Sequence, residues 1–155
     1  MRHERKHPVH GILEYPDRAT VIEVTICTEH RVPCLANETV HQMFRKVWQE
    51  ARAWLVGYYM IMPDHTHFFA APGEIDLSLE RWISYWKREL SLLHPYEKWR
   101  LQVDHWDTRM RNGKQYAERQ EYVKNNPMRK GLVARPDDWP FQGIIFDWCW
   151  WGPHF

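Results

Sequence analysis

Residues 57–70 of this 155-residue chain read Gly-Tyr-Tyr-Met-Ile-Met-Pro-Asp-His-Thr-His-Phe-Phe-Ala. Two mainly apolar runs flank a Pro-Asp turn pair, which predicts a β-hairpin with strands over Gly57–Met62 and His65–Ala70. Side chains two residues apart on a strand point to the same face of the sheet. The second strand is therefore expected to present the imidazoles of His65 and His67 side by side.

Segments on either side of this hairpin give the chain a β-α-β-β-α-β order. Strand and helix periodicities predict, besides the hairpin, a strand over Thr20–Cys27, a helix from Glu38 to about Leu55 with Asn37 as its N-cap, a helix over Leu79–Leu93 and a strand over Val103–Met110. A polar helix over Lys114–Asn125 should follow, stopped by Pro127. This order predicts an α+β, ferredoxin-like fold: a βαββαβ antiparallel sheet with helices on one face, plus an additional C-terminal helix.

Length and composition limit the class of protein. A mass of 19.0 kDa fits one domain, expected over residues 1–155, with an irregular arm at 1–18 and a Trp-rich tail at 136–155. The shares of hydrophobic residues (44%) and charged residues (26%) are typical of a soluble globular chain. No apolar run reaches the roughly 18 residues that span a bilayer, and none follows the N-terminal Met1-Arg2-His3. We therefore expect neither a membrane segment nor a signal peptide.

Cysteine and tryptophan usage add two expectations. Three cysteines without a Cys-x-x-Cys pair predict reduced thiols and a cytoplasmic location, not a disulfide framework or a zinc ribbon. Of the ten Trp residues, Trp82 and Trp86 stand at helical spacing and are expected in the core. The C-terminal cluster Trp148, Trp150 and Trp151 is consistent with covering the sheet, stacking on DNA or forming a dimer.

The formal net charge of +1 conceals an uneven distribution of charge. Between Arg109 and Arg135 there are eight Lys or Arg residues against two Glu, whereas residues 136–155 contain three Asp and no Lys or Arg. Such a basic band is typical of a phosphate-binding surface, although charged runs are often only solvated. With one addition from the second helix, the candidate phosphate-binding residues are Lys87, Arg109, Arg111, Lys114, Arg119, Lys124, Arg129 and Lys130.

Two motifs carry candidate chemistry. His65 and His67 can bind one metal ion, and imidazole suits Mn, Zn, Ni or Fe better than Mg. In a chain with ten His, chance is the alternative explanation. Tyr122 and Asn126 stand four residues apart, so on a helix they share a face. A phenolic oxygen can attack phosphorus and an Asn amide oxygen can complete a two-His metal site, although a core Tyr and a helix-end Asn would be the simpler interpretation of this second motif alone.

Both motifs resemble a known family. Residues 62–69 (MPDHTHFF) and 122–133 (YVKNNPMRKGLV) are similar to the two motifs of the REP-associated tyrosine transposases, which are single-tyrosine members of the HUH endonuclease superfamily. Weaker similarity at 107–111 and 136–140 extends the resemblance over roughly residues 20–145. Thr66, Asp64 and Lys130 depart from the family pattern, but none of the three changes removes a catalytic group.

The resemblance implies a metal-dependent enzyme that cleaves and rejoins single-stranded DNA beside palindromic hairpins. Carried over to this chain, it assigns Tyr122 as the nucleophile that forms a 5′-phosphotyrosine. It assigns His65, His67 and Asn126 as ligands of a divalent metal ion, Mg²⁺ or Mn²⁺. The basic residues named above become candidate DNA-binding residues.

Two other functions stay open at this stage. One is a non-catalytic module of the same fold that binds single-stranded nucleic acid, and the other is a metal hydrolase that uses water, with Tyr122 in a structural role. A trapped phosphotyrosine would separate the transposase from both. Oligomeric state is also open, because related transposases include homodimers that share their Tyr helices and monomers that do not.

Overall fold

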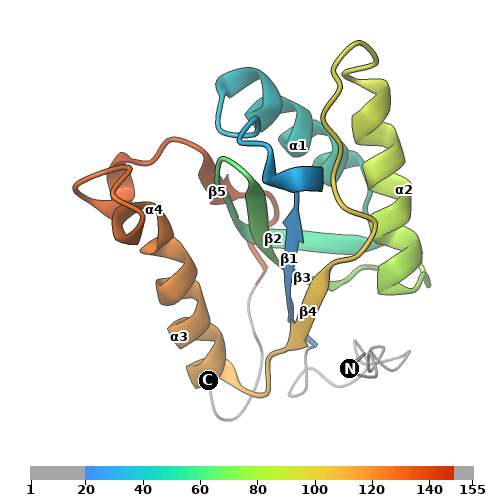
Figure 1. Ribbon diagram of the computed structural model, residues 1–155. Coiled ribbons are helices and arrows are strands. Elements are labelled where there is room, and N and C mark those ends of the chain that lie inside the picture. The colour runs from blue at the N-terminus through green and yellow to red at the C-terminus, as the bar shows by residue number, and fades with distance from the viewer. Residues whose placement is uncertain (1–19, 149–155) are drawn as a thin grey trace.

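A five-stranded antiparallel sheet forms the centre of the molecule in the computed structural model, which describes residues 20–148 (Figure 1). Its strand order is β4-β1-β3-β2-β5. The strands are β1 (Ile22–Cys27), β2 (Trp54–Ile61), β3 (His65–Pro72), β4 (Trp106–Arg109) and β5 (Gln142–Ile144). The order of the first four strands is that of a ferredoxin-like unit, so the predicted fold class is confirmed. The predicted arm at residues 1–18, with Trp150 and Trp151, lies outside the described residues.

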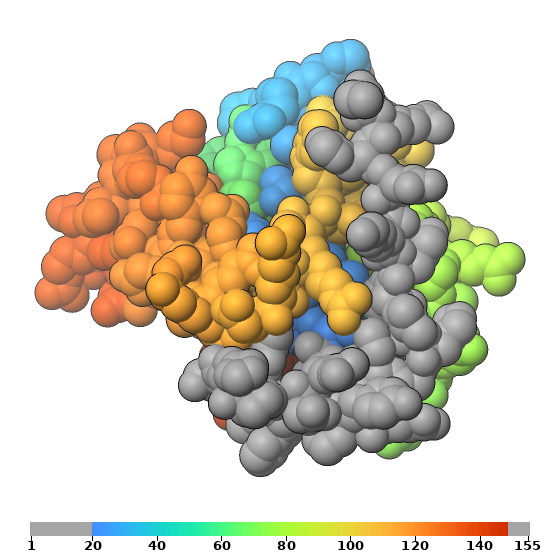
Figure 2. Space-filling model, turned by 90° about the horizontal axis from the view of Figure 1, so that it is seen from below, coloured from blue at the N-terminus to red at the C-terminus, as the bar shows by residue number. Residues whose placement is uncertain are grey.

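Helices lie on both faces of this sheet. As predicted, α1 (Glu38–Glu50) and α2 (Leu79–Leu92) cover one face, whereas α3 (Gly113–Lys124) and α4 (Asn126–Arg129) stand on the other (Figure 1). Seen from below, α2 and the α3–α4 segment lie on opposite sides of the molecule (Figure 2). Within residues 20–148, no helix combines the length and the apolar character needed to cross a bilayer.

Each long helix begins at a polar cap that the sequence supplies. The side-chain oxygen of Asn37 accepts a hydrogen bond from the backbone N–H of Val40 at 3.0 Å, which confirms the cap expected for α1. Ser78 caps α2 and Asn112 caps α3 in the same way. These caps satisfy backbone donors that a helix start leaves unpaired.

The first helix is shorter than predicted. It ends at Glu50, and Leu55, expected near its end, lies in β2 opposite Ala71. The apolar residues after Glu50 fit a helical repeat, but the backbone leaves the helix at Ala51 (φ −86°, ψ 80°). Pairing with β3 then buries Trp54 and satisfies the backbone, so β2 begins three residues earlier than Gly57.

The fourth strand is also shorter than predicted, and a fifth was missed. β4 covers four residues because β1 offers it partners only from Ile22 to Thr25. Before β4, the backbone N–H of Gln102 donates to the carbonyl of Cys27 at 2.8 Å, and the Lys87 ammonium donates to the carbonyls of Gln102 (2.6 Å) and Val103 (3.1 Å). β5 forms from three residues of the segment expected to be a tail, next to the short helix η4 (Pro136–Asp138).

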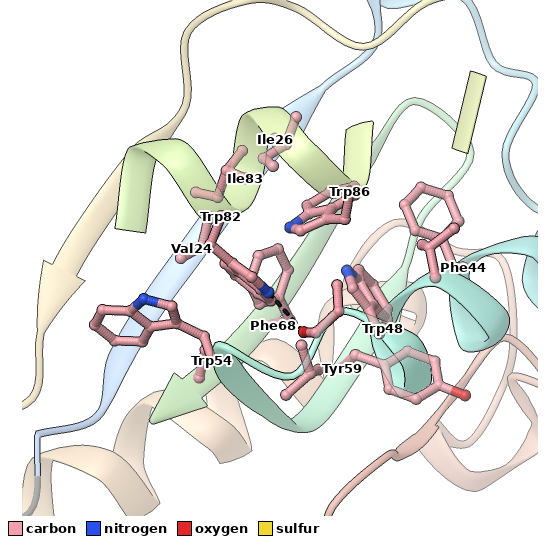
Figure 3. Packing of buried hydrophobic residues seen from close by; sticks show 14 of the residues in the cluster. Val24, Ile26, Phe44, Trp48, Trp54, Tyr59, Phe68, Trp82, Ile83 and Trp86 are labelled. Atoms are coloured by element: carbon pink, nitrogen blue, oxygen red, sulfur yellow. Dashed lines mark hydrogen bonds between the residues drawn. The ribbon is translucent and has the colours of Figure 1, made fainter. Parts of the chain in front are cut away.

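The main core lies between the sheet and helices α1 and α2. Its largest members are aromatic and fully buried: Phe44, Trp48, Tyr59, Phe68, Trp82 and Trp86 (Figure 3). Neighbouring rings meet at tilted or edge-to-face angles, with centroids 4.9–6.1 Å apart between Phe44, Trp48, Phe68 and Trp86. The expectation that Trp82 and Trp86 belong to the core is confirmed.

A smaller apolar cluster lies on the other face, under α3. It includes Met60, Phe69 and Val123, and the ring of Phe69 meets Tyr116 of α3 edge to face at 5.1 Å. Trp148 covers this face at β2, where a Cβ on Gly57 would lie 2.6 Å from the indole. Trp148 therefore covers the sheet, one of the roles expected of its cluster.

Trp82 and Trp86 form a matched pair for testing this core. The indole N–H of Trp82 donates to the carbonyl of Ala51 at 2.7 Å, whereas that of Trp86 has no hydrogen-bond partner within residues 20–148. Trp82→Phe should therefore lower the free energy of unfolding by about 1–3 kcal/mol more than Trp86→Phe, because it strands a buried acceptor. Urea denaturation measures both values, and equal losses would contradict the assigned hydrogen bond.

Candidate active site

Two imidazoles of β3 face the side of the sheet that carries α3. The ring centroids of His65 and His67 are 4.8 Å apart and the ring planes are at 89°. Thr66, between them, points to the opposite face, where its hydroxyl donates to the carbonyl of Met60 at 3.1 Å. The strand alternation expected from the sequence is therefore present, and Thr66 does not crowd the pair.

Hydrogen bonds hold both rings in one orientation. The Nδ1 of His65 lies 2.7 Å from a carboxylate oxygen of Asp64, and the Nδ1 of His67 lies 2.8 Å from the hydroxyl oxygen of Thr25 on β1. A carboxylate only accepts, so the proton of neutral His65 is assigned to Nδ1, and Thr25 can accept from His67 in the same way. Each Nε2 then carries a free lone pair, as in imidazoles that bind metals.

The amide of Asn126 closes the third side of this site. Its Nδ2 is 3.3 Å from the Nε2 of His65 and 3.3 Å from the Nε2 of His67. The two ends of an amide are assigned from their hydrogen bonds, and a half-turn of the side chain would bring Oδ1 to the same place. Two imidazole nitrogens and one amide oxygen then converge, which fits a divalent metal ion.

The break between α3 and α4 places Asn126 at this point. α3 ends at Lys124, and Asn126 begins the separate helix α4 with Pro127 as its next residue. Proline disfavours helical continuation in the residue before it, which explains why the helix is interrupted there. The interruption turns the Asn126 side chain, 7% exposed, toward β3.

Burial keeps both imidazoles neutral. It lowers the pKa of His67 to about 3, and nearby charges of Arg119 and Arg129 add to this effect. It also lowers the pKa of His65, partly opposed by the Asp64 carboxylate. A cationic environment of this kind favours anionic ligands such as phosphate.

Tyr122 stands four residues before Asn126 and is about half exposed (52%). The guanidinium carbon of Arg119 lies 4.6 Å from the centre of its ring, and that of Arg129 lies 3.8 Å from it. Two cations therefore flank the phenol. Arg119 in turn makes two hydrogen bonds, of 2.8 and 2.7 Å, to the buried carboxylate of Glu23 on β1, which anchors α3 to the sheet.

Comparison with known proteins bears on the fold and on the family resemblance. No protein-family model matches the chain. The REP-associated tyrosine transposase of Escherichia coli strain K12 is 30% identical over 109 residues, which cover 66% of this chain and 64% of that protein, slightly less than two thirds of its length. A solved structure described as a REP-associated tyrosine transposase bound to a REP hairpin aligns with a TM-score of 0.74 at 20% identity, over 100% of this chain and 99% of the other. This chain has the fold of a REP-associated tyrosine transposase. The resemblance predicted from the two motifs is confirmed.

The basic residues predicted from the sequence occupy different sides of this transposase fold. Arg111 and Lys114 are exposed beside the start of α3, and Arg129 and Lys130 are exposed at its far end, beside the imidazoles. Lys124 forms an ion pair with Asp137 at 3.2 Å. Lys87 is engaged on the α2 side, and Arg109, opposite Ile22 on β1, faces the same side. Those two are therefore not brought to the His–Asn site.

Two residues around the site, Thr25 and Arg31, were not predicted from the sequence. Thr25 becomes visible only through the register of β1 with β3, which pairs it with His67. Asp64 departs from the family pattern in a way that could bring a carboxylate near the metal, and its carboxylate does lie beside the His65 ring. Arg31 belongs to the short helix η3 (Glu29–Arg31), and its guanidinium donates to the Asp64 carboxylate at 2.9 Å. His30 and Arg31 have positive φ angles of 58° and 53°. Nothing in the local sequence indicates these backbone conformations.

A second group of potential ligands lies elsewhere in the described residues. Atoms of Glu80, His105 and Asp107 lie within 4.8 Å of one another, and the Nε2 of His105 is 2.9 Å from Asp107. Asp107 pairs with Val24, so this group faces the side of α2. This group is therefore an alternative place for a metal ion among the described residues.

The Glu23–Arg119 pair should contribute strongly to the attachment of α3. Arg119→Met leaves a buried carboxylate without its partner and should lower the free energy of unfolding by about 3 kcal/mol. Adding Glu23→Leu should restore most of this loss, because no buried charge then remains. Urea denaturation of the single and double variants tests this, and additive losses would show that the two side chains do not interact.

Proposed function

We propose that this chain is a divalent-metal-dependent endonuclease and strand transferase that cleaves single-stranded DNA beside hairpins through a 5′-phosphotyrosine. The observation that carries the proposal is the convergence of the Asn126 amide on the two Nε2 atoms, four residues after an exposed Tyr122. The solved transposase of the same fold is described as bound to a REP hairpin, which supports hairpin DNA as the substrate class. A cytoplasmic location, expected from the cysteines, agrees with a DNA substrate.

In this mechanism the hydroxyl oxygen of Tyr122 attacks a backbone phosphorus. The phenol gives up its proton, a bond forms between its oxygen and the phosphorus, and the bond to the 3′ oxygen breaks. The 3′ oxygen takes up a proton and leaves as a hydroxyl, so no net proton is gained or lost. The 5′ side stays attached to Tyr122. Attack of a 3′-hydroxyl on this ester reverses the step, so one site both cleaves and rejoins strands.

The surrounding groups prepare this attack. His65, His67 and Asn126 would hold Mg²⁺ or Mn²⁺, which would supply positive charge near the phosphate oxygens and the departing 3′ oxygen. Arg119 and Arg129 flank the phenol, and their positive charge would attract the phosphate. Asp64 and Thr25 keep the imidazoles in the tautomer that exposes Nε2.

DNA binding needs contacts beyond the reacting phosphate. The exposed cations at the two ends of α3 are the best placed of the predicted residues: Arg111, Lys114, Arg129 and Lys130. They lie at the two ends of the helix that carries Tyr122, so a DNA strand that runs along α3 can reach the phenol. Phosphate contacts of this kind give affinity without reading sequence.

Tyr122→Phe should keep hairpin DNA binding and form no covalent adduct, because only the attacking oxygen is removed. Tyr85→Phe is a matched control, since Tyr85 is also 52% exposed but lies on α2. Denaturing gels of labelled hairpins incubated with Mn²⁺ should show an adduct for the wild type and for Tyr85→Phe. An adduct formed by Tyr122→Phe would exclude the nucleophile, and binding without any wild-type adduct would favour a non-catalytic module.

Metal binding should depend on β3 and not on the group around His105. His67→Ala should abolish Mn²⁺ binding, and Thr25→Val should weaken it by about 10–100-fold because it removes the acceptor on Nδ1. Glu80→Gln is the control and should bind Mn²⁺ as the wild type does. Titration followed by electron paramagnetic resonance measures all three.

The same variants define the contrary result. If Glu80→Gln lost Mn²⁺ binding while His67→Ala retained it, the metal site would have to lie on the other face of the sheet. Undiminished cleavage by the wild type in excess EDTA would exclude the metal from the reaction.

A further inference from the structure

Trp106, the first residue of β4, is exposed to an unusual degree. Its side chain is 73% exposed, whereas Trp48, Trp54, Trp82 and Trp86 are at most 3% exposed. An indole ring is normally mostly buried in a folded protein. Trp106 therefore leaves a large flat apolar surface in contact with solvent, and the core does not use it.

The sheet register places this ring on the same face as the candidate active site. Trp106 pairs with Thr25 of β1, and Thr25 pairs with His67 of β3, so the three residues form a row across β4, β1 and β3. Residues directly opposite each other in an antiparallel sheet point to the same side. Two strand spacings separate Trp106 from His67, a distance of about 10 Å.

The surroundings of this row suit a nucleic acid strand. The buried carboxylate of Glu23, next along β1 on this face, is neutralised by Arg119. The carboxylate of Asp107 belongs to the other face, where it meets His105. Exposed Arg111 lies two residues beyond the end of β4. An exposed apolar ring on the face of the imidazoles, which Arg129 and Lys130 approach, suits the alternation of bases and phosphates in a single strand.

We propose that Trp106 is a stacking platform for one unpaired base of the DNA strand, in a nucleotide close to the scissile phosphate. This inference rests on the proposed function for the identity of the ligand. Unpaired bases stack on aromatic side chains with little regard to sequence, so the platform positions the strand and selects single-stranded over paired DNA at that nucleotide.

The test combines a protein variant with a missing base. The probes are fluorescent DNA hairpins with single-stranded thymidine flanks, intact or with one abasic site placed in turn at each flanking position. Fluorescence anisotropy gives the affinities, measured in the Tyr122→Phe background so that no cleavage intervenes. Trp106→Ala should weaken binding of the intact probe by about 5- to 150-fold, and Trp106→Phe should retain most of the affinity.

In the decisive result, the effect of the missing base disappears when the Trp106 ring is removed. At a single flanking position the abasic site should weaken binding by the protein with Trp106, but it should have little effect on Trp106→Ala. Val103→Ala is the control, because Val103 is 87% exposed in the segment before β4 and should bind as the parent does. Thermal unfolding of Trp106→Ala should be unchanged, since the removed ring is exposed.

Several outcomes would overturn the inference. These are equal affinities of the parent and Trp106→Ala, an abasic effect that persists undiminished in Trp106→Ala, or no binding to any of these strands. A change from dimer to monomer in Trp106→Ala without a change in DNA affinity would make the ring an interface between two copies. Failure of the proposed function is separate, because it shows as the absence of an adduct with wild-type protein whatever Trp106 does in the binding assay.

Discussion

The antiparallel register between β1 and β3 is the constraint on which the candidate site depends. It places Thr25 opposite His67, where the hydroxyl oxygen fixes the imidazole, and Glu23 opposite Phe69, where the carboxylate anchors Arg119 of α3. A shift of one residue would turn these side chains to the other face of the sheet. The ring orientations and the attachment of the Tyr122 helix would then be lost together.

The two faces of the sheet divide structure from chemistry. The α1–α2 face holds most of the large aromatic side chains. They pack against one another, and those at the centre of this face are fully buried. The α3 face carries a smaller apolar cluster and, beside it, the imidazoles, the amide and the paired cations. Rigid packing on one face can therefore hold a polar arrangement on the other, since both are built on the same strands.

Electrostatics connect the parts of the α3 face. Neutral imidazoles with free Nε2 lone pairs stand among Arg31, Arg119, Arg129 and Lys130, while the carboxylates of Glu23 and Asp64 are each paired with an arginine. The imidazoles would offer neutral ligands to the proposed metal ion, and the surrounding cations would attract the proposed phosphate. This combination distinguishes the candidate site from the Glu80, His105 and Asp107 group, where two of three ligands are carboxylates.

Local patterns in the chain were sufficient for most of the fold and for the two motifs. Strand alternation placed His65 and His67 on one face, helical spacing identified Trp82 and Trp86 as core, and Asn37 marked the start of α1. These features depend on periodicity and capping, which a single segment carries. The end of α1 was predicted wrongly, because an apolar run fits a helix or a strand equally well until a partner strand is present. Thr25, Arg31 and the exposed ring of Trp106 gained their places only from long-range pairing, since register, face and exposure are properties of neighbouring strands and not of the residues themselves.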